Sequence, residues 1–170
     1  QSAAAILFLL LASSVYLSTV GTKAETDLLQ QYIPIAEMRS LTLPDGTKVQ
    51  LNSKSTLLYP HEFTGDSRSV FLLGEANFKV KPDKKRPFIV KSNDLQITAL
   101  GTEFNVSAYP ESQEIATTLI SGSIRVDYNN LTTSVILHPN EQFAYNRNNK
   151  KYDLSNPDMD DVTAWQRGEL

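Results

Sequence analysis

The chain has 170 residues, a net charge of −3 and a pI near 5.4, and it contains no cysteine. Because binding to nucleic acid requires a concentrated basic surface, the acidic balance predicts no DNA or RNA partner. The absence of cysteine excludes disulfides, thiolate catalysis and cysteine-ligated metals, so packing must stabilise the fold. The length suits one soluble domain of ordinary size.

The N-terminal segment is apolar. Residues 3–20 are eighteen consecutive positions without a charge, whereas all charged side chains lie between Lys23 and Glu169. As a helix this run would cover roughly 27 Å, close to the hydrocarbon thickness of a bilayer. A secretory signal peptide is the alternative, but its apolar core is usually shorter, and no small-x-small cleavage site follows here. We therefore predict a transmembrane helix over residues 1–22 and a juxtamembrane stalk over residues 23–34.

Residues 35–153 have the pattern of a β domain. Short runs rich in Val, Ile, Thr, Phe and Tyr alternate with Gly, Pro, Asn and Asp, which is typical of about ten strands separated by turns. This spacing favours an antiparallel β-sandwich or jelly roll over a βαβ sheet. The predicted fold class is therefore all-β, preceded by one transmembrane helix and ended by a short α-helix.

The clearest turn signal separates two short runs that alternate apolar and polar side chains. Pro44 occupies the second position of this turn, Asp45 the third, and Gly46 a position where a positive φ is expected. The runs on either side, residues 39–43 and 49–51, should therefore pair as a β-hairpin.

A second glycine-containing segment marks a change in the phase of burial. Leu95, Ile97 and Ala99 occupy odd positions, whereas Phe104, Val106 and Ala108 occupy even ones. Because strand side chains alternate with period two, this change requires one extra residue. We therefore predict a bulge at Gly101 and Thr102.

The last segment, residues 154–170, is predicted to be a short helix leading to a further domain. Asn156 is the expected cap, Pro157 suits the first helical position, and Gly168 should end the helix. Trp165 is expected to pack against the β domain. Three carboxylates complement the helix dipole at the N-terminal end better than they fit a calcium loop: Asp158, Asp160 and Asp161.

No group of residues points to catalysis. His61 and His138 are the only histidines, neither lies in a nucleophile elbow, and two histidines cannot form a cupin-type metal cluster alone. We interpret both as loop residues. Paired carboxylates of a glycoside hydrolase remain an alternative, although nothing singles out a pair among Glu75, Glu103, Glu111 and Glu114. The prediction is a protein that is not an enzyme, with no catalytic residue, metal or cofactor.

Two surface features bear on partner binding. The densest basic run is interpreted as a solvated loop, with a docking patch for acidic partners or lipid headgroups as the alternative. Its members are Lys79, Lys81, Lys84, Lys85, Arg86 and Lys91. A carbohydrate site would need exposed aromatic side chains, but strand alternation points four of them inward. These are Phe78, Phe104, Tyr128 and Phe143.

Five segments, in the same order, resemble the conserved blocks of the FecR family. They are residues 43–53, 73–80, 86–90, 100–106 and 118–122. The resemblance covers roughly residues 32–170, and an ordered set of five blocks is far more specific than any one of them. The residues that carry the resemblance are interpreted as structural: Pro44, Asp45, Gly46, Gly74, Glu75, Phe78, Gly101, Thr102, Phe104, Asn105, Val106 and Gly122.

The resemblance implies an anti-sigma factor of the Bacteroidota type, which spans the inner membrane once and places its β domain in the periplasm. It also implies that a TonB-dependent transporter of the outer membrane contacts the periplasmic part through its signalling domain. Regulated proteolysis then passes the signal to an extracytoplasmic-function sigma factor in the cytoplasm. The sigma-binding segment is expected before Gln1, and the transporter-binding domain after Leu170.

Two functional hypotheses follow. The first is the signal relay that the resemblance implies. The alternative is a membrane-anchored β-sandwich that binds carbohydrate or processes glycosides, which would need an exposed aromatic platform or two carboxylates facing each other across a cleft.

The turn assignment makes a testable prediction. Replacing Gly46 with valine should lower the melting temperature, because a β-branched residue resists a positive φ at a cost of about 1 kcal/mol or more. The measurement is thermal unfolding followed by circular dichroism. An unchanged melting temperature would contradict the assigned turn.

Overall fold

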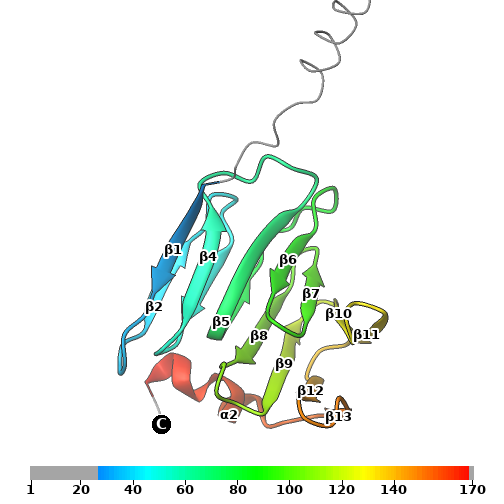
Figure 1. Ribbon diagram of the computed structural model, residues 1–170. Helices are drawn as coiled ribbons and strands as arrows, with labels where there is room; N and C mark the ends of the chain where they lie inside the picture. Colours follow the sequence, from blue (N-terminus) through cyan, green and yellow to red (C-terminus); the bar gives the residue numbers. More distant parts are fainter. Residues whose placement is uncertain (1–26, 169–170) are drawn as a thin grey trace, which may run out of the picture.

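The computed structural model describes residues 27–168, which form one curled β-sheet and a short helical segment (Figure 1). The strands of this part are β1 (Leu28–Tyr32), β2 (Arg39–Thr42), β3 (Lys48–Leu51), β4 (Thr56–Pro60), β5 (Arg68–Lys79), β6 (Phe88–Lys91), β7 (Gln96–Ala99), β8 (Glu103–Ala108), β9 (Glu114–Ser121), β10 (Ile124–Tyr128), β11 (Thr133–Leu137), β12 (Gln142–Asn146) and β13 (Tyr152–Ser155). The helical segments are α2 (Met159–Ala164) and the 3-10 helix η1 (Trp165–Arg167). The predictions of an all-β fold and a short C-terminal helix are confirmed.

No helix within residues 27–168 is long and apolar enough to cross a membrane. The predicted transmembrane helix, residues 1–22, lies outside the part of the chain that the structure describes.

The strands form a single sheet with the order β11-β10-β7-β6-β5-β8-β9-β12-β13. Strands β4 and β1 continue from the first half of β5, whereas β3 and β2 continue from its second half. The pairs are antiparallel, as predicted, with one exception: β5 and β6 run parallel. The predicted sheet is wrong at this pair, because residues 80–87 carry the chain back to the start of β5 before β6 begins.

Strand β5 bends at Gly74 and thereby belongs to both halves of the sheet. Half A contains its first residues with β1, β4, β6, β7, β10 and β11, and half B contains its last residues with β2, β3, β8, β9, β12 and β13. Gly74 has a φ of +96°, and a Cβ atom there would lie 2.7 Å from Ser55 Cα. The bend brings Arg68, at the start of β5, within hydrogen-bonding distance of the Lys81 carbonyl oxygen, just beyond its end. A curled open sheet therefore replaces the predicted sandwich or jelly roll.

The two halves enclose one hydrophobic core. The Phe78 ring from half B stacks on Phe104, with centroids 5.4 Å apart, and also contacts Phe88 from half A at 5.9 Å. At another side of the core, Tyr128 from β10 meets Phe143 from β12 at 5.2 Å. Burial raises the pKa of the Tyr128 hydroxyl. The predicted inward orientation of these aromatic side chains is confirmed, and the contacts between the halves hold the curl closed.

The predicted hairpin turn is present. The Gly46 amide donates to the Leu43 carbonyl oxygen at 2.9 Å, Gly46 has a φ of +88°, and β2 pairs with β3 on either side. Proline and glycine at these positions therefore act as the sequence predicted.

The β domain extends further in both directions than predicted. Residues Leu28–Tyr32, expected in the stalk, form β1 and pair with β4 along its whole length, and the next residue, Ile33, is fully buried. At the other end, Tyr152–Ser155 forms β13 on the edge of half B. These edge strands lack the long apolar alternation that identifies central strands, and residues 27–168 contain thirteen strands where about ten were expected.

The predicted bulge at Gly101 and Thr102 is wrong. Both residues lie in the connection between β7 and β8, and the irregular pairing of β8 with β9 lies at Glu103 and Phe104. The phase of burial changes here because the chain passes from half A to half B, so that the opposite set of side chains faces the core.

The C-terminal helix begins two residues later than predicted. Asp158, rather than Asn156, is the N-cap, and its Oδ1 atom accepts from the Asp160 amide at 2.9 Å. The Asn156 side chain donates instead to the Asn140 carbonyl oxygen. Gly168, with a φ of +75°, ends the helical segment as predicted.

The bend in β5 predicts that Gly74→Ala destabilises the protein. The new methyl group would overlap the backbone of Ser55 at a positive φ, and we expect a loss of roughly 2–4 kcal/mol in the free energy of unfolding. Urea denaturation measures this loss. The matched control is Gly65→Ala, where no atom lies within 4 Å of the added Cβ, and its effect should stay below about 1 kcal/mol. Equal stability of the two variants would contradict the proposed role of Gly74.

Candidate functional site

The residues singled out from the sequence do not gather in one pocket. They divide into the hairpin turn, the bend of β5 and the connection between β7 and β8, while three belong to the core. The buried core members are Phe78, Phe104 and Val106.

At the hairpin turn, Asp45 accepts three hydrogen bonds. Its carboxylate receives the Thr47 amide at 2.9 Å, the Thr47 hydroxyl at 2.7 Å and Arg68 Nη1 at 2.7 Å. The Arg68 side chain, 1% exposed, also donates to the carbonyl oxygens of Lys81 and Arg86. This ion pair joins the turn of half B to the first residue of β5 in half A.

At the bend of β5, Glu75 is held by its neighbours. Its carboxylate accepts from Asn52 Nδ2 at 2.8 Å and from Asn105 Nδ2 at 2.9 Å. The Ser55 hydroxyl donates to the Glu75 carbonyl oxygen and accepts from the Glu75 amide. Both carboxylate oxygens of Glu75 therefore accept hydrogen bonds from neighbouring side chains of the domain.

The third group fixes the passage from β7 to β8. A Cβ atom on Gly101 would lie 2.9 Å from Pro82, and one on Gly122 would lie 2.6 Å from the Thr102 side chain. The Thr102 carbonyl oxygen accepts from the Val80 amide at 2.9 Å. Close backbone approach explains the glycines at these two positions.

The candidate glutamates of β5 and β8 are engaged in hydrogen bonds within the domain. The Glu75 carboxylate accepts from Asn52 and Asn105, and the Glu103 carboxylate accepts from Asn77. Glu111 and Glu114 are exposed near the connection between β8 and β9.

The histidines lie on the surface, as predicted. His61 is exposed after β4, and His138 Nδ1 lies 3.3 Å from the Glu141 carboxylate. The hydrogen bond from the His138 amide lowers the pKa of Glu141. Within residues 27–168, no three His, Asp or Glu side chains come close enough to hold a metal ion.

The side chains of the basic run make separate local contacts and do not form one patch. Arg86 Nε lies 3.0 Å from Asp83 Oδ2, and this hydrogen bond lowers the pKa of the Asp83 carboxyl. Lys79 pairs with Glu103 at 3.4 Å, and Lys91 lies over an aromatic ring. Carboxylates therefore partly offset the charge of the run.

A row of amide and hydroxyl side chains crosses the outer face of half B. Its members are opposite one another in the register of β3, β5, β8, β9 and β12. We call this the amide row: Gln50, Asn77, Asn105, Thr118 and Gln142. Gln142 Nε2 donates to Thr118 Oγ1 at 2.7 Å. The row is not visible in the sequence because its members are far apart in the chain, and only the register of the strands aligns them.

Asn77, Asn105 and Thr118 of the amide row are buried although they lie on the outer face, whereas Gln50 and Gln142 are partly exposed. We call the segment that covers the row, residues 156–168, the C-terminal strap. The strap starts beside β12, where Asn156 donates to Asn140, and reaches β3, where Gln50 Nε2 donates to the Gln166 carbonyl oxygen at 3.2 Å. Between these points it passes beside the lower ends of β9, β8 and β5 in the view of Figure 1.

A groove of about 510 Å³ lies where the strap meets β2, β3, β5 and β8. It is lined by Ser40, Leu41, Thr42, Lys48, Val49, Gln50, Asn77, Lys79, Glu103 and Gln166. These groups can donate and accept hydrogen bonds, but they include no nucleophile paired with a base.

The comparisons with known proteins agree with this structural interpretation. The family model described as FecR protein matches residues 33–125, more than half of the chain. The chain belongs to the FecR family. The resemblance noted from the five sequence segments is thus confirmed.

Two crystal structures resemble this FecR chain, and both are of a candidate anti-sigma factor from Parabacteroides distasonis ATCC 8503. One, at 2.50 Å resolution, has a TM-score of 0.80 and 39% identity over 84% of this chain and 66% of that chain. The other, at 1.65 Å, has a TM-score of 0.79 and 38% identity over 82% and 65%. The FecR chain therefore spans slightly less than two thirds of these proteins. No curated protein matches it significantly.

The outer face of half A of this FecR domain carries an apolar cluster over β1 and β5. Tyr32 on β1 and Phe71 and Leu73 on β5 are exposed on either side of β4, and Leu28 lies at the start of β1. The FecR domain thus presents an exposed apolar cluster on half A and a row of polar side chains on half B. Surfaces of these kinds suit a regulatory protein that works by contact.

The ion pair of the hairpin turn predicts a large effect of Arg68→Leu. Removing the guanidinium leaves the Asp45 carboxylate, 4% exposed, without its cation, and we expect a loss of roughly 3–5 kcal/mol in unfolding free energy. Urea denaturation at neutral pH measures it. The matched control is Arg39→Leu, because the contact of Arg39 with Glu37 is half exposed and should contribute less than about 1 kcal/mol.

A double variant provides the internal check. Asp45→Ala combined with Arg68→Leu should lose less stability than the sum of the two single changes, because both charges are then absent. Strictly additive losses would show that the two side chains act independently.

Proposed function

We propose that this chain is the membrane-anchoring and periplasmic part of a FecR-type anti-sigma factor. In this role it relays a signal from an outer-membrane TonB-dependent transporter to an extracytoplasmic-function sigma factor in the cytoplasm. The observation that carries the proposal is the likeness to crystal structures of a candidate anti-sigma factor, at 39% identity and a TM-score of 0.80. Anti-sigma factors regulate by contact, which agrees with a protein that is not an enzyme.

The geometry supports a relay made by a rigid body. The residues that carry the FecR resemblance lie in the hairpin turn, at the bend of β5 and in the core. Their contacts join the two halves of the sheet into one unit. A rigid unit transmits a displacement from one end to the other without deforming. A displacement caused by binding at one end of the domain is therefore transmitted to the other end.

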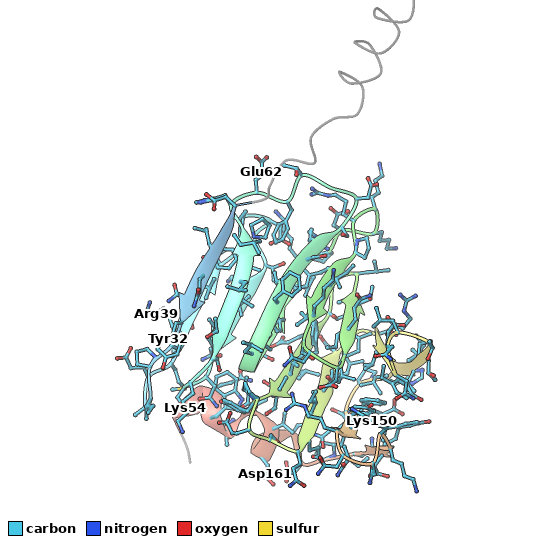
Figure 2. The ribbon with its side chains drawn as sticks, in the orientation of Figure 1. Tyr32, Arg39, Lys54, Glu62, Lys150 and Asp161 are labelled. Atoms are coloured by element: carbon cyan, nitrogen blue, oxygen red, sulfur yellow. The ribbon has the colours of Figure 1, made fainter. Side chains whose placement is uncertain are left out.

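The arrangement of the chain gives the proposed relay a direction. Leu28 pairs with Pro60 next to Glu62, so the described chain starts at the end of the molecule that carries Glu62. Asp161, on the strap, lies at the opposite end (Figure 2). With residues 1–22 as a single span of the inner membrane, the strap is on the side away from the bilayer, where a transporter would approach.

The proposal is tested by crosslinking in the native host. The intact protein, tagged and purified after crosslinking in cells, should carry an extracytoplasmic-function sigma factor and the signalling domain of a TonB-dependent transporter. An unrelated single-span protein of the inner membrane with the same tag is the control. Recovery of neither partner would contradict the relay. Specific binding on a glycan array would favour the carbohydrate-binding alternative instead.

A further inference from the structure

A cavity of about 280 Å³ lies between the two halves of the sheet, at the ion pair of the hairpin turn. It is lined by Asp45, Arg68, Lys81, Pro82, Asp83 and Arg86. Asp45 belongs to the turn of half B and Arg68 to the start of β5 in half A, while the other four lie in the connection from β5 to β6. All of these side chains except the proline are charged, so a ligand of this cavity is expected to carry a charge as well.

Arg68 is the buried cation of the cavity, with a side chain that is 1% exposed. Its Nε and Nη1 atoms have acceptors, whereas Nη2 is buried without a hydrogen bond. Several neutral side-chain atoms within residues 27–168 also lack a partner, but Arg68 Nη2 is the only one of them in a charged group. A missing acceptor destabilises a buried charged donor more than a neutral one. An acceptor that enters the cavity would remove this destabilisation.

Lys81 adds a second cation, and its ammonium group is not paired. The side chain lies along the hairpin turn: a Cβ atom on Gly46 would lie 3.0 Å from Lys81 Cδ and 3.4 Å from Lys81 Nζ. In the described part of the chain, Lys81 Nζ makes no hydrogen bond or ion pair. The lysine is exposed, so its ammonium group can move to a ligand in the cavity without breaking a contact.

The two carboxylates of the cavity are already engaged. Asp45 lies 2.7 Å from Arg68 Nη1, and Asp83 lies 3.0 Å from Arg86 Nε. Each carboxylate is thus offset by a guanidinium, and the charge of Lys81 remains as the excess. The cavity therefore favours an anion over a cation.

The arrangement of the cations suits an anion that presents oxygens in several directions. Arg68 begins β5, whereas Lys81 and Arg86 lie near the two ends of the connection to β6. A carboxylate presents two oxygens in one plane, whereas a phosphate group is tetrahedral, and arginine and lysine are the side chains that bind phosphate in proteins. We propose that this cavity is a binding site for a phosphate group, held by Lys81, Arg86 and the buried Arg68. Because the ligand bridges both halves of the sheet, its binding stabilises the curl.

The position of the cavity indicates two sources of the phosphate group. Arg86 Nη1 donates to the Phe63 carbonyl oxygen at 3.2 Å, so the cavity lies at the end of the molecule that carries Glu62 (Figure 2). The described chain starts at the same end. One source is free phosphate in solution. The other is a phospholipid headgroup, and this second source rests on the membrane span that the proposed function includes.

Amide NMR of the full chain tests the site in micelles of a maltoside detergent, which contains no phosphate. Titration with inorganic phosphate, at an ionic strength held constant with chloride, should shift the amides of Asp45, Gly46, Lys81 and Arg86 along a saturating curve. Millimolar concentrations avoid the general stabilisation of proteins by concentrated phosphate. Amides that do not shift, or that shift without saturation, would overturn the proposal, since water alone would then fill the cavity.

Matched variants separate the site from the effect of net charge. Lys81→Met should weaken phosphate binding at least about fivefold, and Lys81→Arg should keep the affinity within about twofold. Lys84→Met is the control, because Lys84 is exposed on the same connection but does not line the cavity. Its affinity should also stay within about twofold of the unaltered chain. Equal weakening in Lys81→Met and Lys84→Met would overturn the proposal.

The same NMR measurement in nanodiscs of phosphatidylglycerol identifies the source. With a lipid phosphate in the cavity, the four amides already have their bound-state shifts, and added inorganic phosphate moves them no further. With free phosphate as the ligand, the titration in nanodiscs repeats the one in micelles. Either result supports the site once the titration in micelles saturates. Neither depends on recovery of a sigma factor or a transporter, so the outcome is independent of the crosslinking test.

Discussion

The ion pair between Asp45 and Arg68 joins the two halves of the sheet at the end opposite the bend of β5. The bend at Gly74 folds this strand back on itself, so its two ends face each other across the core and must be tied together. A buried guanidinium is tolerated only beside a counter-charge. Here the hairpin turn supplies the carboxylate, and the connection between β5 and β6 supplies two carbonyl oxygens. Three distant segments are thereby fixed by one side chain.

The dependence of the curled sheet on this ion pair explains the role of the residues that carry the FecR resemblance. Asp45 and Gly46 shape the turn that receives Arg68, Glu75 holds the bend, and Gly101 permits close approach to the neighbouring loop. The pattern therefore specifies the curl of the sheet and not a binding pocket. The surfaces that a partner can reach lie elsewhere, on the apolar cluster over β1 and β5 and on the strap and groove of half B.

The features predicted from the sequence are those encoded by neighbouring residues. Pro44 and Gly46 determine a turn through their own backbone preferences, and the inward alternation of Phe78 and Phe104 follows from strand geometry alone. The parallel pairing of β5 with β6 depends on where a crossover returns the chain, which no local pattern records. The strap is similar: the burial of Asn77 becomes visible only when a segment almost ninety residues later lies over it.

The route of the chain also determines how the domain responds to tension. The backbone hydrogen bonds between β1 and β4 lie across the strand direction, so a pull along β1 loads all five residue pairs together, in shear. The strap instead crosses the strands, and a pull on Gly168 at the far end of the molecule loads its contacts one after another, as in peeling. Shear resists force far better than peeling does. A stretched chain would thus yield first at its C-terminal end, while its N-terminal strand remains in place.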